Sequence, residues 1–350
     1  MQKLRILKLS VELTRKCNLK CCHCMKGDAQ NVDIGRNYIE KLCNFVSEVN
    51  VLHITGGEPS MNTSGMRHLI NTIRKENITI HSINVIFNGR TNYACVFLKQ
   101  LEELNALTMH PDRSRFSVSV DVFHGEGSNS SLKNFFSGYN AVKNLQRETS
   151  LSLYPYFTSN YPPLLATGRA KSLPTAVDPD DPNKCGNSCI MPIITHGNTV
   201  DWLHLSANGV ICVDGNQSYE YLDNTEHNIG HIDDFSTPDD LLSGIEKWNN
   251  KKDVRIRGAL FDIGRQLLSV CKDCPVGHAV YVKKIQYVKA ILESQDFLDY
   301  PQSFKNSEFI AMLNSILAEY EDIQADPTLT LNDCNDCMWW DFEHLGDVII

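Results

Sequence analysis

The sequence lacks any run of about eighteen apolar residues, so no segment has the length and hydrophobicity of a transmembrane helix. The opening stretch MQKLRILKLSVELT is interrupted by Lys8 and Glu12, and no small-residue cleavage site follows it, which argues against a secretory signal peptide. An excess of positive charge is also missing. With a net charge of −9, we expect neither nucleic acid nor a membrane as a partner. These absences predict a cytoplasmic protein.

Cysteine, by contrast, is abundant. The chain has 13 cysteines in 350 residues, and most lie in short clusters at positions 17/21/22/24, 185/189, 271/274 and 334/337. In a reducing compartment such clusters indicate metal or redox chemistry rather than disulfides. Apolar residues make up 42% and charged residues 21%, as in an ordinary soluble protein, and the length favours two domains or one large barrel with an appendage.

The first half of the chain alternates between two hydrophobic periods. Strand-like segments are RILKLSVELT, VLHIT, HSINVIFNG, RFSVSVDVF and SLSLYPYFT. Between them, helical spacing occurs in IGRNYIEKLCNFVSEV, MRHLINTIRKE, TNYACVFLKQLEELN and SLKNFFSGYNAVKNLQRE. Repeated strand and helix units predict a parallel sheet, either doubly wound or part of a (β/α) barrel.

Unusual residues follow the ends of four predicted strands. They are the cysteines of residues 17–24, the sequence Gly56-Gly57-Glu58-Pro59, Asn88-Gly89, and Asp121 with His124. Parallel α/β proteins build their sites from loops at the carboxyl ends of strands. We therefore expect these four loops to form one site.

The first cysteines have the spacing Cys17-x3-Cys21-x2-Cys24. Three thiolates on one loop can hold three irons of a four-iron cluster and leave the fourth iron without a protein ligand. The alternative is a structural zinc ion, with His23 or Cys22 completing four ligands. Taken alone, the GGEP sequence is typical of a turn with proline at the first helical position.

Together, the Cys17-x3-Cys21-x2-Cys24 motif and the GGEP motif make residues 7–175 resemble the radical SAM superfamily. The resemblance implies an α/β fold, a partial (β/α)6 TIM-type barrel over residues 1–175. It also implies a [4Fe–4S] cluster that binds S-adenosylmethionine and reductively cleaves it to a 5′-deoxyadenosyl radical, which abstracts hydrogen from a substrate. An external reductant of the flavodoxin or ferredoxin type is implied as a partner.

The resemblance also implies a set of cofactor-binding residues: His23, Gly56, Gly57, Glu58, Asn88, Ser119 and Arg169. Glycine lets the backbone approach the methionine amino group closely. His23 stands where the superfamily commonly has an aromatic residue near the adenine. Arg169 could pair with the methionine carboxylate, or it could lie solvated on a helix.

After residue 172 the sequence becomes rich in Pro, Asp, Asn and Ser, which indicates a linker, and TVDWLHLSANGVICVDGN then predicts a hairpin. The later cysteines resemble those of SPASM and twitch domains, which implies a cysteine-rich α+β domain with C-terminal helices over residues 176–350. The implied metal ligands are Cys185, Cys189, Cys212, Cys271, Cys274, Cys334 and Cys337. We expect at least one auxiliary [4Fe–4S] cluster. A second cluster, or a zinc ion held by the last two cysteine pairs, stays open.

The leading functional hypothesis is a radical SAM oxidoreductase that modifies a peptide or protein, as the resembling families mostly do. Because the chain begins a few residues before the first predicted strand, any leader peptide would be recognised by another surface or a separate protein. One alternative is radical dehydrogenation or rearrangement of a small molecule such as a sugar or aminocyclitol. The other is a non-catalytic zinc- and cysteine-rich interaction protein.

Four further residues carry individual expectations. Asp121 and His124, just beyond a strand end, are the candidate catalytic residues, as a substrate-side base or positioning group. Asp121 could instead simply cap its loop. Cys43 and Cys95 are expected to be buried core thiols on apolar helix faces.

Overall fold

In a computed structural model, the chain forms two compact units. The first unit comprises Met1–Val177 and Gly197–Glu246, and the second comprises Asp178–His196 and Lys247–Ile350. The structure describes residues 2–124, 132–156, 168–173, 176, 193, 195–213, 215, 217–252, 254, 256, 260, 286, 288–299, 302–306 and 308–319.

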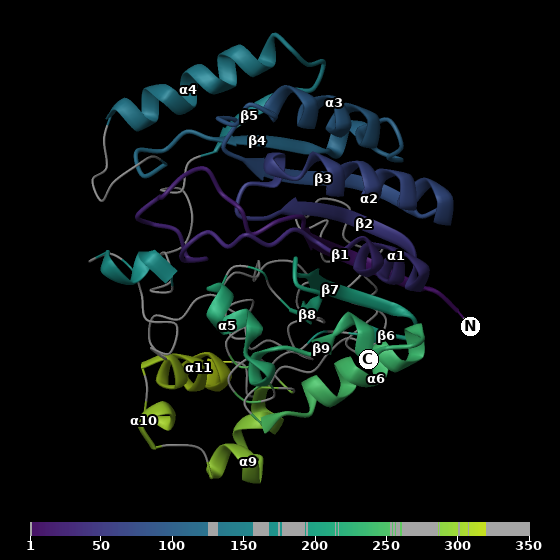
Figure 1. The fold of residues 1–350 in the computed structure, drawn as a ribbon. Helices are drawn as coiled ribbons and strands as arrows, with labels where there is room; N and C mark the ends of the chain where they lie inside the picture. The colour runs from purple at the N-terminus through teal and green to yellow at the C-terminus, as the bar shows by residue number, and fades with distance from the viewer. Residues whose placement is uncertain are drawn as a thin grey trace. The chain divides into compact units, whose positions relative to one another are not determined.

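The first unit begins with alternating strands and helices, as the sequence predicts (Figure 1). The strands are β1 (Leu4–Glu12), β2 (Val46–Thr55), β3 (Thr79–Phe87), β4 (Arg115–Ser119) and β5 (Leu153–Tyr156). The helices are α1 (Arg36–Phe45), α2 (Thr63–Glu76), α3 (Ala94–Asn105) and α4 (Leu132–Gln146). Short 3-10 turns are η1 (Pro59–Met61), η2 (Pro111–Arg113) and η4 (Gly168–Ser172).

The sheet of this unit is mostly parallel. Its strand order is β5-β4-β3-β2-β1-β7-β8-β9, and every pair from β5 to β1, as well as the β1–β7 pair, is parallel. The predicted α/β class with a parallel sheet is therefore confirmed, while the partial barrel stays a prediction. Because β1 to β4 are parallel, their carboxyl ends lie at one edge of the sheet.

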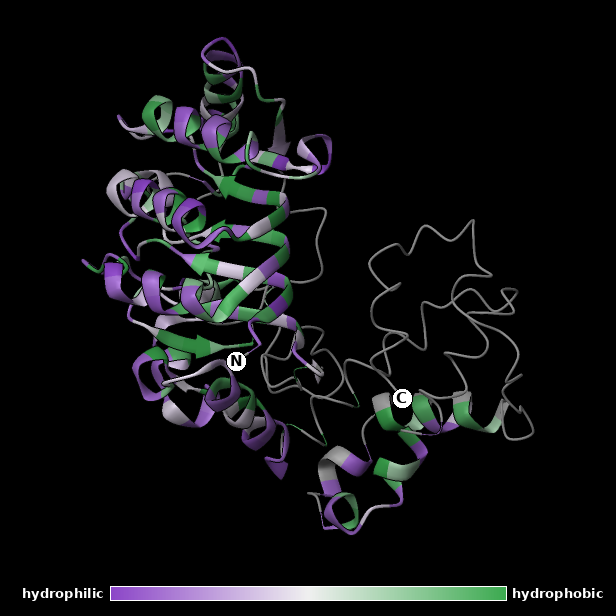
Figure 2. Ribbon diagram, turned by 90° about the vertical axis from the view of Figure 1, so that its right-hand side faces the viewer, coloured by the Kyte–Doolittle hydropathy of each residue, from purple (hydrophilic) through white to green (hydrophobic). Residues whose placement is uncertain are grey.

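Near the carboxyl ends of the strands, the two faces of the sheet carry different side chains. One row of neighbouring residues is His204, Ser10, His53 and Asn84, contributed in turn by β7, β1, β2 and β3. The next row along the strands is apolar and consists of Leu205, Val11, Ile54, Val85 and Phe116. Successive strand residues point to opposite faces, so at this level of the sheet the polar row lies on one face and the apolar row on the other. Helices α1 to α4 lie along one side of these mostly apolar strands (Figure 2).

After the gap that ends the first segment, the unit continues with β7 (Thr199–Leu205), β8 (Val210–Cys212) and β9 (Gly230–His231). Strands β7 and β8 form the predicted antiparallel hairpin, and Gly209 adopts the left-handed conformation (φ +87°) that its turn requires. Helix α5 (Tyr219–Asp223) and the turns η5 (Thr225–His227) and η6 (Ile232–Asp234) follow β8. The predicted division of the chain at residue 175 stays a prediction.

The second unit contains β6 (Thr195–His196), α9 (Gln295–Leu298), α10 (Gln302–Lys305) and α11 (Glu308–Glu319), and α6 (Pro238–Asn249) lies at its boundary with the first. Helix α11 lies within the region 176–350 for which C-terminal helices are predicted. Six of the predicted ligands lie outside the described residues: Cys185, Cys189, Cys271, Cys274, Cys334 and Cys337. Among the described helices, none combines the length and hydropathy needed to span a membrane.

Candidate active site

The cysteine loop (residues 17–24) leaves the carboxyl end of β1 and lies next to the loops that follow β2 and β3. Cys21 is buried, and Cys17 and Cys24 are partly exposed. The Cys17 Sγ accepts a hydrogen bond from the Leu19 amide at 3.4 Å, and the Cys24 amide donates to the Cys21 carbonyl at 3.2 Å. Burial raises the pKa of the Cys17 thiol to about 11, against the opposing hydrogen bond from Leu19. A metal ion bound there would have to displace the thiol proton.

Gly56 and Gly57 pack directly against the chain that leads into the cysteine loop. The Gly57 amide donates to the Thr14 carbonyl at 2.7 Å. A Cβ atom on Gly57 would lie 2.5 Å from the Lys16 carbonyl oxygen, and one on Gly56 would lie 2.6 Å from that of Thr14. Only glycine allows this approach, so the β2 loop fixes where the cysteine loop starts.

Glu58 ties the loops after β2 and β3 together. Its Oε1 accepts hydrogen bonds from the amide and the hydroxyl of Ser60, and its Oε2 accepts one from the Asn88 amide at 2.7 Å. Burial raises the pKa of Glu58, and these hydrogen bonds oppose that rise. The Asn88 side-chain amide in turn donates to the Asn18 side chain at 2.8 Å, which connects β3 to the cysteine loop.

Arg169 supports the cysteine loop from the side. Its Nε donates to the Cys21 carbonyl at 2.9 Å, its Nη1 contacts Asp28 at 2.9 Å, and its amide donates to the Cys24 carbonyl at 3.0 Å. The preceding Gly168 has φ +53° and approaches the backbone of Cys24 and Met25 so closely that a Cβ atom would overlap it. In this structure Arg169 is thus a support for the loop backbone rather than a solvated helix residue.

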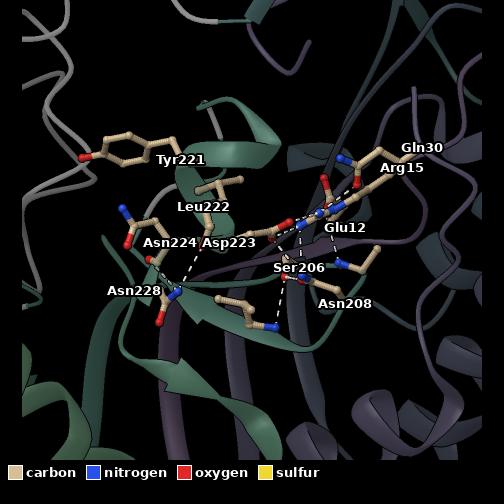
Figure 3. A network of polar contacts seen from close by, with 12 residues as sticks. Glu12, Arg15, Gln30, Ser206, Asn208, Tyr221, Leu222, Asp223, Asn224 and Asn228 are labelled. Atoms are coloured by element: carbon tan, nitrogen blue, oxygen red, sulfur yellow. Dashed lines mark hydrogen bonds and ion pairs between the residues drawn. The ribbon is translucent and has the colours of Figure 1, made fainter. Parts of the chain in front are cut away.

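A buried charge network holds the chain where it enters the cysteine loop. Figure 3 shows the Arg15 guanidinium between the carboxylates of Glu12 and Asp223. Both Nη atoms of Arg15 donate to Asp223 at 2.7 Å, and its Nε contacts Glu12 at 3.2 Å. Burial acts to lower the pKa of Arg15, but Asp223 and Glu12 outweigh that effect and raise it. No local sequence pattern indicates this network, although Arg15 lies two residues before Cys17.

His23, Asp121 and His124 lie together beside the cysteine loop. The His124 Nδ1 and Asp121 Oδ1 are 2.7 Å apart, and the imidazole rings of His23 and His124 have centroids 4.6 Å apart. Burial, assisted by His124, lowers the pKa of His23 to about 4, so His23 is neutral at neutral pH. The structure thus brings the predicted residues of the β1 and β4 loops into one cluster.

The spacing of possible ligand atoms bears on the choice between a cluster and a mononuclear zinc site. Four sulfurs around one zinc ion lie about 3.8 Å apart, given zinc–sulfur bonds of about 2.3 Å. Within the described part of the chain, three or more possible ligand atoms lie within 4.8 Å of one another only at His23, Asp121 and His124. The thiols of Cys17, Cys21 and Cys24 therefore do not all lie within 4.8 Å of one another in this structure, which is compatible with ligands of separate irons.

The remaining predicted residues have mixed outcomes. Ser119 ends β4 and is buried, and Cys212 is buried on β8, where it pairs in register with His204. The prediction of a buried Cys43 is confirmed, but that for Cys95 is wrong because Cys95 is exposed. The buried face of helix α3 consists of Ala94, Phe97, Leu98, Leu101 and Leu104. Cys95 follows Ala94 by one residue and lies outside this face.

Comparison with known proteins supports the iron–sulfur assignment. Residues 9–122 match the family model described as "4Fe-4S single cluster domain", which confirms the expectation of a [4Fe–4S] domain around the cysteine loop. No curated protein matches the sequence significantly.

Three solved structures show distant similarity to the chain. The structure of anSMEcpe with bound AdoMet and Cp18Cys peptide is 13% identical, covers 89% of this chain and 99% of its own, and has a TM-score of 0.44. Streptococcus suis SuiB is 12% identical over 67% of this chain, with a TM-score of 0.31, and SuiB bound to its precursor peptide SuiA is 13% identical over 60%, with a TM-score of 0.28. The match spans 65% and 60% of the two SuiB chains, less than two thirds. Scores below 0.5 do not establish a shared fold.

Proposed function

We propose that the protein is a radical SAM enzyme that modifies a peptide or protein. The observation that carries this proposal is the position of three thiols on one loop at the carboxyl edge of a parallel sheet, within the match to the [4Fe–4S] domain. We assign Cys17, Cys21 and Cys24 as the ligands of that cluster. When bound, the cluster supplies the electron that cleaves S-adenosylmethionine to the hydrogen-abstracting radical.

In this proposal each residue around the loop has its own task. Gly56 and Gly57 let the loop after β2 pack closely against residues 14–16. Glu58 connects the loops after β2 and β3 through its hydrogen bonds from Ser60 and Asn88. We assign these residues, together with His23, Ser119 and Arg169, to the S-adenosylmethionine site.

Asp121 and His124 are assigned to the substrate side. The Asp121 Oδ1 accepts one hydrogen bond from the Phe123 amide at 3.0 Å and pairs with the His124 Nδ1. The carboxylate therefore fixes the orientation of the imidazole. An oriented imidazole can position a substrate or accept its proton. The proposal also includes the partial barrel, the auxiliary cluster ligands (among them Cys212), a peptide substrate, and a reductant of the flavodoxin or ferredoxin type.

The test is anaerobic reconstitution with iron and sulfide, followed by incubation with S-adenosylmethionine and dithionite. We expect 5′-deoxyadenosine to form with the wild-type protein and with Cys95→Ser, whose thiol is exposed on α3, but not with Cys24→Ala. Absence of 5′-deoxyadenosine from the iron-loaded wild-type protein would refute the radical assignment. Turnover of a small molecule but of no peptide would refute only the peptide assignment.

A further inference from the structure

The polar cluster beside the cysteine loop has the composition of a metal site that uses no sulfur. Its members are two imidazoles and one carboxylate, from His23, His124 and Asp121, and each offers one donor atom within 4.8 Å of the other two. Two histidines and one carboxylate, with a coordination position left open, form a recurrent set for catalytic zinc and for other first-row divalent ions. The residues come from two loops, those after β1 and β4, so the fold itself brings them together.

His23 has an unsatisfied nitrogen inside this cluster. The residue is 8% exposed, and its Nδ1 is buried with no hydrogen-bond partner among the described residues. A buried polar atom without a partner is destabilising, because it has lost its hydrogen bonds to water. Coordination to a cation would satisfy this nitrogen, which the Phe123 ring at 5.4 Å cannot do by hydrogen bonding.

His124 is oriented as metal-bound histidines are. Its Nδ1 lies 2.7 Å from the Asp121 Oδ1, and that oxygen is itself fixed by the Phe123 amide. When Nδ1 donates its proton to the carboxylate, Nε2 carries the lone pair that binds a metal. Asp121 can orient His124 in this way or contribute an oxygen to the metal directly.

The distances allow closure around an ion. Ligand atoms bound to a tetrahedral zinc ion at about 2.0–2.1 Å lie about 3.3 Å from one another. Donor atoms already within 4.8 Å reach that separation by small side-chain rotations. Two neighbouring cations oppose binding, but both are engaged elsewhere: Arg90 donates to the His124 and Asn134 carbonyls, and Arg169 contacts the Cys21 carbonyl and Asp28.

We propose that His23, Asp121 and His124 form a second metal site, for a divalent cation such as Zn²⁺, whose open position takes an oxygen group of the substrate. The proposal rests on the geometry of these side chains and not on the radical reaction. It specifies how Asp121 and His124 could hold a substrate: through a cation, with the cysteine loop supplying the third ligand.

The experiment is a zinc titration of the iron-loaded, desalted full chain, with metal per chain measured after removal of free ion. Iron occupies the cysteines during the titration, and S-adenosylmethionine is left out because the resemblance places its adenine beside His23. The wild-type protein and the control His110→Asn, altered at a histidine before β4, are expected to bind about one zinc ion more per chain than His23→Asn or His124→Asn. Asp121→Asn keeps the side-chain volume and is expected to weaken binding at least about tenfold. Asp121→Asn serves as the test variant if a histidine variant does not fold.

Cobalt identifies the donors. The spectrum of cobalt-loaded wild type minus that of cobalt-loaded His124→Asn is expected to contain d–d bands without an intense thiolate-to-cobalt band. Equal zinc uptake by wild type and all three variants, no uptake by the wild type, or a thiolate band in the difference spectrum would each overturn the site. None of these readouts uses radical chemistry, so a failure to form 5′-deoxyadenosine would leave the metal result standing.

Discussion

Arg15→Ala tests how the start of the cysteine loop is held. The substitution removes a guanidinium that pairs with two carboxylates, Glu12 and Asp223. Glu12 is fully buried, and after the change its described partners are the Lys26 Nζ at 3.5 Å and the Ala207 amide at 3.0 Å. Removing one partner of a buried ion pair costs about 3–5 kcal/mol, because the remaining charge stays desolvated. The Asp223 side chain is 37% exposed and adds at most about 1 kcal/mol.

The assay is urea unfolding of the iron-free protein, followed by circular dichroism. A matched control is Arg5→Ala, which breaks the half-exposed pair with Glu48 and is expected to cost about 0–1 kcal/mol. The double variant Glu12→Gln/Arg15→Ala removes the stranded charge and is expected to be more stable than Arg15→Ala alone. If Arg15→Ala costs no more than Arg5→Ala, or if the double variant is less stable than the single one, the network does not hold the loop as described.

Three further predictions concern the loop and the sheet. Gly57→Ala is expected to lower the iron content after reconstitution several-fold, because its Cβ would lie 2.5 Å from the Lys16 carbonyl; an iron content equal to wild type would show that the loop adapts. Arg169→Gln is expected to reduce iron loading as well as S-adenosylmethionine affinity, since Arg169 binds the Cys21 carbonyl; lost affinity with full iron loading would assign it to the cofactor alone. Burial lowers the pKa of His53 from 6.5 to about 4, so the unfolded state binds the proton first, and stability is expected to fall as pH drops from 6.5 to 4. The urea unfolding midpoint of His53→Asn is expected to fall less over this pH range than that of the wild type. An unchanged pH dependence would contradict the role of His53.

The sequence predicts the alternation of the first half well because each strand and helix has its own periodicity. Its errors lie at boundaries. The predicted helix IGRNYIEKLCNFVSEV ends at Phe45, and the next residue already begins β2, so its last residues pair with β1 and β3 instead. The predicted strand RFSVSVDVF ends at Ser119, and Asp121 and His124 lie in the loop beyond it. Periodicity alone does not separate adjoining elements of different type.

Motif spacing identifies the cysteine loop and the GGEP loop, but it cannot identify supports that come from distant parts of the chain. Arg15 and Asp223 are 208 residues apart, and Arg169 is 148 residues from Cys21. Local sequence contains no signal for such pairs. His23, Asp121 and His124 differ from these pairs, because their positions after the ends of parallel strands predict that their loops share one site.

The central claim is that Cys17, Cys21 and Cys24 hold one iron–sulfur cluster rather than a zinc ion. It is tested most directly by measuring iron and zinc per chain after anaerobic reconstitution of the wild-type protein and of Cys17→Ala/Cys21→Ala/Cys24→Ala. We predict that the triple variant carries about four fewer irons per chain and the same amount of zinc. A variant that loses one zinc ion and no iron would contradict the claim.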